Sequence, residues 1–389
     1  MTNKYLFSNY GLIGENLDLK QNINLEIDQS GKILNLSYDD IDKGVKVSPS
    51  HQILLMIPGF INSHIHIGDN FAKEIGFNKE LAEVVAPPFG FKHKLLRQTP
   101  EDIKIKGIQN AMLEMLSNGI TFFIDFREEG TEGVILLKKA LNNTPINFLI
   151  LGRFMDESEI DSIFDLADGV GLSNYKEITS TNKELVISAK EKFNKMIACH
   201  CAENIHNPGL IKRMFNDNLI DVIIHGTKLV KKDLENIIEN GKALVLCPRC
   251  NGYFGVGFPP INEILKLKIP VSLGTDNLMV NNTDLFEEMR YFYRIFRVLC
   301  NYNKEVQLSS KDLLKMVTIN AAKNFNLEKE YGSISKNKFA DFFLINLCHP
   351  NLFSSKLDCN SIYNLITQRV KSENIIKTYI RGELVYERK

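Results

Sequence analysis

The sequence predicts an α/β fold: a (β/α)8 TIM-like barrel with a small β-sandwich domain built from both chain ends. Two observations favour this fold class. Through the middle of the 389-residue chain, eight short apolar runs alternate with longer amphipathic stretches, whereas both ends alternate short apolar runs with turns. Eight strand–helix units form a closed parallel barrel. We therefore expect residues 58–330 to form the barrel, and residues 1–57 and 331–389 to form the two parts of the β domain.

The two chain ends have the pattern of antiparallel strands. Near the N-terminus, residues 5–13 and 22–38 hold short apolar runs, with a turn signal at "DQSG". Near the C-terminus, residues 340–347 form an apolar run, and residues 375–388 predict a hairpin with Arg381 and Gly382 at its turn. Neither end can bury a core alone, so we expect the two ends to pair.

The eight apolar runs of the middle segment predict the eight barrel strands. They occupy residues 54–67, 119–127, 146–154, 168–175, 195–203, 221–227, 243–251 and 270–277. Between them, stretches such as residues 100–118 and 231–241 have the apolar spacing of helices, with acidic residues in the first turn and Asn or Gly at the end.

Composition limits the partners and the compartment. Lys+Arg and Asp+Glu both number 47, so the net charge is zero and nothing favours nucleic acid or a membrane through bulk electrostatics. The N-terminus lacks a long apolar segment, so we expect no signal peptide and no membrane span there. Seven cysteines, an odd number, predict reduced thiols in the cytoplasm. Composition therefore predicts neither a nucleic-acid partner nor a membrane partner.

Polar residues gather at the carboxyl ends of four of the expected strands. They are His64 and His66 in the first run, His200 in the fifth, His225 in the sixth and Asp276 in the eighth. Because side chains alternate along a strand, His64 and His66 face the same way. One such histidine alone is more often a hydrogen-bonded polar group than a ligand. Together, imidazoles and a carboxylate at one end of a barrel predict a site for zinc or ferrous iron.

Three segments resemble the amidohydrolase superfamily: "PGFINSHIHI" at 58–67, "LGTDNLMVNNTDLFEEMR" at 273–290, and "TINAAKNFNLEKEYGSISKNKFADFFLINL" at 318–347. The resemblance runs over nearly the whole chain. It implies that the metal is bound by His64, His66, His200 and Asp276. It also implies that His225 hydrogen-bonds the reacting water or the substrate.

The segment "CHCAEN" at 199–204 indicates a branch within that superfamily. Its Glu203, with "CPRCN" and "GVGFPPI" further on, is similar to members that deaminate cytosine, guanine, adenosine-type compounds and triazines. In such an enzyme a water activated by the metal attacks an amidine-like ring carbon, Asp276 takes the water's proton, and Glu203 passes protons to the ring nitrogen and to ammonia. The alternative for Glu203 is a solvated carboxylate that caps the next helix.

These observations predict a deaminase of an amino-substituted N-heterocycle (a purine, pyrimidine, pterin or nucleoside-like compound), which is a hydrolase of carbon–nitrogen bonds other than peptide bonds. We expect one divalent metal ion per chain, zinc first and iron as the alternative. A second metal would need a bridging Lys or Glu on the fourth strand, and Lys176 lies past that strand. We expect no structural zinc at the cysteines.

Substrate contacts are expected from arginines that follow strands and from the segment after the first strand. The arginines are Arg127, Arg153 and Arg249, which suit carboxylates, phosphates or carbonyl oxygens but could also pair with local acids. Residues 68–97 predict a lid that offers Lys92 and His93. The resemblance adds Asn251, which helps to shape the site.

Two other functions stay open at this point. The first is a hydrolase of the same superfamily with another leaving group, acting on a cyclic amide or a chloro-heterocycle. The second is a barrel that has lost catalysis and serves as a scaffold, although this chain keeps all the expected site residues. Residues 285–300 form an aromatic helix pattern that suits either the core or a homodimer interface.

Overall fold

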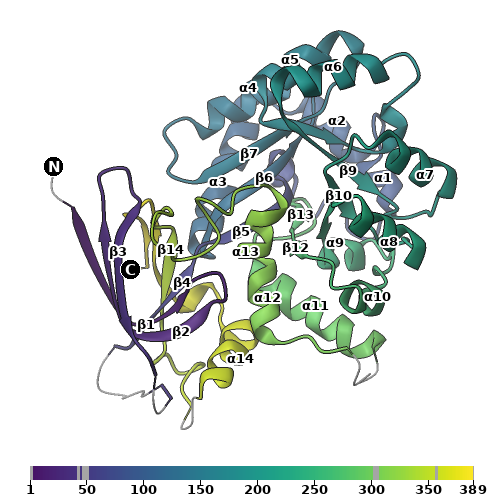
Figure 1. The fold of residues 1–389 in the computed structure, drawn as a ribbon. Helices are drawn as coiled ribbons and strands as arrows, with labels where there is room; N and C mark the ends of the chain where they lie inside the picture. Colours follow the sequence, from purple (N-terminus) through teal and green to yellow (C-terminus); the bar gives the residue numbers. More distant parts are fainter. Residues whose placement is uncertain (1–2, 42–43, 46–51, 301–305, 355–357, 389) are drawn as a thin grey trace.

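The barrel is a parallel sheet that closes on itself (Figure 1). The computed structural model describes residues 3–41, 44–45, 52–300, 306–354 and 358–388. The sheet has the order β12-β11-β10-β9-β8-β7-β6-β5-β13. Its strands are β5 (Phe60–His66), β6 (Ile120–Arg127), β7 (Asn147–Gly152), β8 (Gly169–Leu172), β9 (Met196–Cys201), β10 (Val222–His225), β11 (Ala243–Leu246), β12 (Val271–Leu273) and β13 (Asp276–Asn277). Each expected run contains its strand, which confirms the predicted fold class.

The eighth barrel strand is split into β12 and β13, and this split closes the barrel. β12 pairs with β11, whereas β13 pairs with β5 and places Asp276 opposite Ile65. Gly274 lies between the two pieces, and a Cβ there would come within 2.7 Å of the backbone of His64. Only glycine permits this close approach. The side chain of Asn62 then exchanges two hydrogen bonds with Thr275, at 2.8 and 3.0 Å.

Helices surround the barrel, and its strands are apolar on both faces. On β6, Phe122, Ile124 and Phe126 join the cluster inside the barrel, whereas Phe123 packs with the outer layer. This is the two-residue alternation of a strand that is covered on both sides. The helices are α3 (Glu101–Ser117), α4 (Gly130–Leu141), α5 (Ile160–Leu166), α6 (Lys183–Phe193), α7 (Pro208–Asp217), α8 (Lys231–Glu239), α9 (Pro248–Tyr253), α10 (Ile261–Lys266), α11 (Leu285–Leu299), α12 (Ser310–Met316), α13 (Ile319–Asn324) and α14 (Cys359–Arg369). The helices predicted at 100–118 and 231–241 are α3 and α8.

The two chain ends build one mixed sheet of seven strands beside the barrel (Figure 1). Its order is β16-β15-β14-β4-β1-β2-β3, in which β1 and β4 are parallel and the other neighbours are antiparallel. The strands are β1 (Lys4–Ile13), β2 (Asp18–Ile27), β3 (Ile33–Asp39), β4 (Leu54–Pro58), β14 (Phe342–Asn346), β15 (Ile375–Ile380) and β16 (Glu383–Glu387). The chain passes from β4 into barrel strand β5 across Gly59.

The segment between β5 and α3 folds into short helices over the mouth of the barrel. They are the 3-10 helix η1 (Ile67–Ala72), α1 (Leu81–Val85) and α2 (Phe91–Gln98). We call residues 67–98 the lid. Further 3-10 turns are η2 (Glu157–Glu159), η3 (Tyr175–Glu177) and η4 (Ser372–Asn374). The longest helix among the described residues, α3, has 17 residues, and none there is long and apolar enough to cross a membrane.

Candidate active site

The four histidines and the aspartate predicted from the sequence meet at the carboxyl ends of β5, β9 and β10 and at the start of β13. Nε2 of His64 lies 3.2 Å from Nε2 of His200 and 3.3 Å from Oδ1 of Asp276. Nε2 of His66 lies 3.4 Å from the same oxygen. Two groups of possible ligands have all their donor atoms within 4.8 Å of one another: His64 with His66 and His200, and His64 with His225 and Asp276.

Hydrogen bonds at the far side of two imidazoles aim their Nε2 atoms at the centre of this cluster. Nδ1 of His200 lies 2.9 Å from the carbonyl oxygen of Leu172, and Nδ1 of His66 lies 3.1 Å from that of Phe126. A carbonyl oxygen only accepts, so Nδ1 carries the proton and Nε2 keeps its lone pair. Such contacts fix the tautomer that a metal ligand needs.

Burial keeps two of the histidines in the protonation state that binds a cation. It lowers the pKa of His64 to about 3 and that of His200 well below its ordinary value, so both imidazoles are neutral. Burial works to raise the pKa of Asp276, but hydrogen bonding to His64 and the neighbouring histidines outweigh it and lower that pKa well below its ordinary value. Oδ2 of Asp276 is buried without a hydrogen-bond partner. Imidazole lone pairs that converge on a carboxylate are the donor set of a divalent metal ion, and the unpaired Oδ2 atom is left for another partner.

Two of these residues hold a backbone conformation that side chains rarely adopt. The φ angle is +72° at His225 and +62° at Asp276. Each such residue costs on the order of 1–3 kcal/mol, and strain of this kind gathers at functional sites. The barrel therefore holds His225 and Asp276 in orientations that an unstrained strand end would not give.

Glu203 lies beside this cluster, as the proton-shuttle reading of the sequence requires. It follows β9, and its Oε2 atom is 3.7 Å from Nε2 of His225, which in turn is 3.9 Å from Oδ2 of Asp276. Burial raises the pKa of Glu203, so the carboxyl keeps a proton more readily than an exposed one. Nδ2 of Asn251 lies 3.3 Å from Nδ1 of His225 and can donate to it, which leaves the Nε2 proton of His225 facing Glu203.

A cavity of about 400 Å³ opens above the cluster and is closed on one side by the lid. We call it the main cavity. Apolar lid residues and Phe126 of β6 line one part of it, and a polar wall lines another; these residues are Leu81, Ala82, Val85, Ala86 and Pro87 of the lid and Arg153, Ser173, Asn174 and Lys176 of the wall. The floor contains His66, His200, His225, Asp276 and Glu203. A flat ring of modest polarity fits such surroundings.

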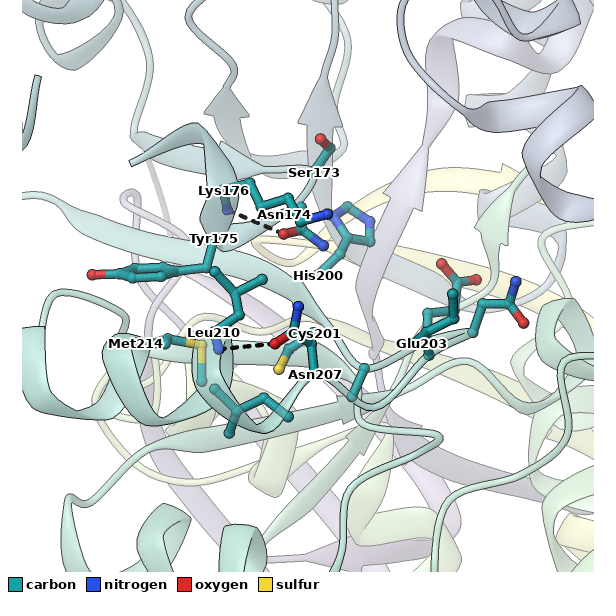
Figure 2. Close-up of a pocket in the computed structure, with 14 residues that line it drawn as sticks. Ser173, Asn174, Tyr175, Lys176, His200, Cys201, Glu203, Asn207, Leu210 and Met214 are labelled. Carbon is teal, nitrogen blue, oxygen red and sulfur yellow. Dashed lines mark hydrogen bonds between the residues drawn. The ribbon is translucent and has the colours of Figure 1, made fainter. Parts of the chain in front are cut away.

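A second cavity of about 270 Å³ adjoins the main one (Figure 2). We call it the side cavity. It shares six lining residues with the main cavity: Ser173, Asn174, Lys176, His200, Glu203 and Asn204. In Figure 2, Tyr175, Leu210 and Met214 lie on one side of it and Glu203 on the other. The site therefore extends from the metal cluster toward η3 and α7.

The structure places the expected substrate contacts in different surroundings. Arg153 lines the main cavity and pairs with Glu177. Arg127 also lines it, but its Nη2 donates to Oε2 of Glu128 over 3.1 Å. His93 lines it too, with Nε2 3.1 Å from the carbonyl oxygen of Val85, and burial lowers its pKa to about 4.

The structure does not bring Arg249 into either cavity. The residue lies in the first turn of α9, which carries its side chain away from the barrel mouth toward α11. Its Nε donates to Glu288 over 2.6 Å, and its Nη atoms donate to Asn282 and Glu287. A guanidinium has five N–H groups, and four are taken. Asn251, two residues on along α9, faces the opposite way and reaches His225 instead.

Sequence reasoning missed three buried residues that surround the metal ligands. Glu128 lies 2.7 Å from Nδ1 of His66, Asn277 donates to Oδ1 of Asp276 over 2.9 Å, and Asp69 faces Lys92. Two of them could have been suspected, because Glu128 follows β6 directly and Asn277 follows a ligand. Lys92 itself is 3% exposed and held by these groups.

Comparisons with known proteins find relatives along most of the chain. A model of the amidohydrolase family matches residues 55–385. A "putative aminohydrolase" of Methanothermobacter thermautotrophicus is 32% identical over 378 residues, covering 92% of this chain and 93% of that protein. A 5-methylthioadenosine/S-adenosylhomocysteine deaminase of Thermoanaerobacter pseudethanolicus is 27% identical over 370 residues, covering 85% and 81%.

Solved structures share the fold at low identity. An adenosine deaminase from Xanthomonas campestris with bound zinc superposes with a TM-score of 0.81 at 16% identity, covering 98% of this chain and 92% of that one. Guanine deaminase of E. coli gives 0.78 at 16% identity, covering 99% and 100%. Atrazine chlorohydrolase of Arthrobacter aurescens with zinc gives 0.76 at 16%, covering 98% and 94%.

Proposed function

Because this chain belongs to the amidohydrolase family, as its sequence motifs predicted, we propose that it is a metal-dependent deaminase that releases ammonia from an amino-substituted N-heterocycle. It is a deaminase-like hydrolase of that superfamily, with a buried His/Asp cluster that fits a metal ion. One observation carries the step from hydrolase to deaminase. Glu203 is half-buried beside the cluster and lines the cavity, where a proton can pass to a ring nitrogen and to a leaving amine.

His64, His66, His200 and Asp276 would hold one divalent ion, with zinc favoured over iron because two of the structural neighbours contain zinc. When bound, the ion supplies a water whose pKa falls toward about 7. The residues of β8 are Gly, Val, Gly and Leu, and Lys176 lies beyond it in η3. This supports one metal rather than a bridged pair.

The remaining chemistry is proton transfer by this chain's own side chains. The unpaired Oδ2 atom of Asp276 can accept the proton of the attacking water. Glu203, protonated more readily because burial raises its pKa, can donate to the ring nitrogen next to the attacked carbon and later help ammonia to leave. His225 presents its Nε2 proton to the oxygen on which charge develops.

The shape of the site favours a ring that carries a substituent. The main cavity suits the ring itself, between the apolar lid and the metal cluster, and the side cavity offers about 270 Å³ for an attached group. Relatives named as deaminases of 5-methylthioadenosine and S-adenosylhomocysteine support an aminopurine nucleoside with a 5′ substituent as the first substrate to try.

The experiment is an ammonia assay on zinc-loaded protein with adenine, adenosine, 5-methylthioadenosine, S-adenosylhomocysteine, guanine, cytosine and a chlorotriazine. We expect ammonia release, with a higher kcat/KM for substituted nucleosides than for free bases. Hydrolysis without ammonia, or chloride release from the triazine, would instead establish another leaving group. A folded, zinc-loaded protein that converts none of the seven compounds would contradict the proposal and favour the scaffold alternative.

A further inference from the structure

Lys92 is a buried cation in the first turn of the lid helix α2. Its Nζ donates a hydrogen bond to Oδ1 of Asn277 over 2.8 Å, forms an ion pair with Oε1 of Glu128, and lies 3.5 Å from Oδ2 of Asp69. An ammonium has three N–H groups, and three protein acceptors surround this one. One hydrogen bond and two ion pairs within the protein therefore hold the ammonium of Lys92, although it lines the main cavity.

Glu128 joins Lys92 to one of the metal-site histidines. Its Oε1 atom, which pairs with Lys92, lies 2.7 Å from Nδ1 of His66, and its Oε2 atom accepts from Arg127. Metal-binding imidazoles commonly give their second ring N–H to a carboxylate, which sets the ring orientation and raises ligand basicity. Glu128 lies beside Nδ1 of His66 as an ion-pair partner, while the carbonyl oxygen of Phe126 accepts the Nδ1 proton.

Asn277 makes a second connection from Lys92 to the metal site. Its Oδ1 atom accepts from Lys92, and its Nδ2 atom donates to Oδ1 of Asp276 over 2.9 Å. Both ends of the amide are thus used, so its orientation is fixed. One ammonium on the lid is linked to two of the four residues that would hold the ion.

The charges of this cluster depend on one another. Lys92 and Glu128 form an ion pair whose side chains are only 3% and 6% exposed, so each charge depends on the other for compensation. Removing one partner would leave the other buried and unpaired, which is costly in a protein interior.

We propose that Lys92 and Glu128 are positioning residues of the metal centre, which tie the lid helix to His66 through Glu128 and to Asp276 through Asn277. This inference rests on the metal site of the proposed function. Because Lys92 lies on α2, the links are complete only when the lid is seated on the barrel. Seating of the lid then strengthens metal binding, and by linkage metal binding strengthens seating by the same factor.

The test measures zinc affinity by competition with a chromophoric chelator. Glu128→Gln keeps the shape of the side chain and removes its charge, and Lys92→Met removes the ammonium. We expect each variant to bind zinc about 10–100-fold more weakly. Two matched controls are Glu129→Gln in the same loop, whose carboxylate pairs with Lys104 instead, and Lys94→Met on the exposed face of α2. The zinc affinity of both controls should stay within about twofold of the parent's, well short of the loss expected for the test variants.

The double variant Lys92→Met/Glu128→Gln keeps the test valid if a lone buried charge prevents folding. It leaves neither member of the pair charged, and we expect its zinc affinity to be no weaker than that of the poorer single variant, because groups in one network are not additive. Hydrogen exchange gives the reciprocal readout. Zinc should slow exchange of lid amides 81–98 in the parent protein and much less in the double variant.

Parent-like zinc affinity in folded Glu128→Gln or in the double variant would overturn the inference, as would zinc protection of the lid that is equal in parent and double variant. These readouts need no turnover. If the variants lose zinc affinity but no substrate releases ammonia, the positioning role stands and the proposed reaction fails. If ammonia is released but zinc affinity is unchanged, the positioning role alone is wrong.

Discussion

The metal cluster and the lid meet at one cavity, but they are positioned in different ways. His66 and Asp276 belong to β5 and β13, which are neighbours in the barrel, so the sheet itself brings them together. The lid consists of helices of five to eight residues between β5 and α3, held through contacts such as that of Lys92 with Glu128. For the proposed reaction, we therefore expect the barrel to determine the chemistry and the lid and the adjoining wall to determine which ring is accepted.

The largest expected effect comes from the cluster. Asp276→Ala removes a ligand and the acceptor of the water's proton together, so we expect kcat to fall by about 10⁴-fold or more. Reconstitution with excess zinc should not restore it. Ammonia release and bound zinc, measured on the same sample, check this expectation. Recovery of activity with added zinc would mean that Asp276 serves only as a ligand.

Glu203→Gln should retain zinc but lose about 10²–10⁴-fold in kcat, since the amide cannot deliver a proton. The pH profile gives a sharper form of this prediction. Burial raises the pKa of Glu203, so the proton-bearing form persists to higher pH and is lost as the pH rises through that pKa. The parent's kcat should fall on the alkaline side, and the residual activity of the variant should lack that limb. Near-normal kcat in the variant would refute the deaminase assignment.

Substitution of Arg153 tests whether the polar wall of the main cavity contacts the substrate. Arg153→Ala should raise KM for a substituted substrate about tenfold, as expected for loss of one charge-assisted hydrogen bond, with kcat much less affected. Arg153→Lys keeps the charge without the planar donor group, so its KM should lie between that of the parent and that of Arg153→Ala. Unchanged steady-state kinetics in both variants would exclude this wall from substrate recognition.

Arg249 provides the contrast, because it lies outside both cavities. Arg249→Met leaves Glu288 buried and unpaired, so we expect the free energy of unfolding to fall by about 3–5 kcal/mol while KM stays near the parent value. Denaturant unfolding and steady-state kinetics on the same preparation separate these effects. A raised KM with unchanged stability would mean that Arg249 contacts the substrate.

The barrel and the metal cluster could be predicted from sequence because strand ends follow simple geometry. His64 and His66 share a strand face, and parallel strands end at one rim. Arg249 shows the limit, since a helix begins at Pro248 directly after β11 and turns its side chain outward. Glu128 and Lys92 could not be paired from sequence, because 36 positions separate them and only the packed lid brings them together.

The central claim is that one metal ion and Glu203 together release ammonia from a ring. The most direct test measures metal per chain and ammonia per product on a single active preparation. The account predicts about one zinc ion per chain and one ammonia for each oxo-heterocycle formed. About two metal ions per chain, or an oxo product formed without ammonia, would contradict it.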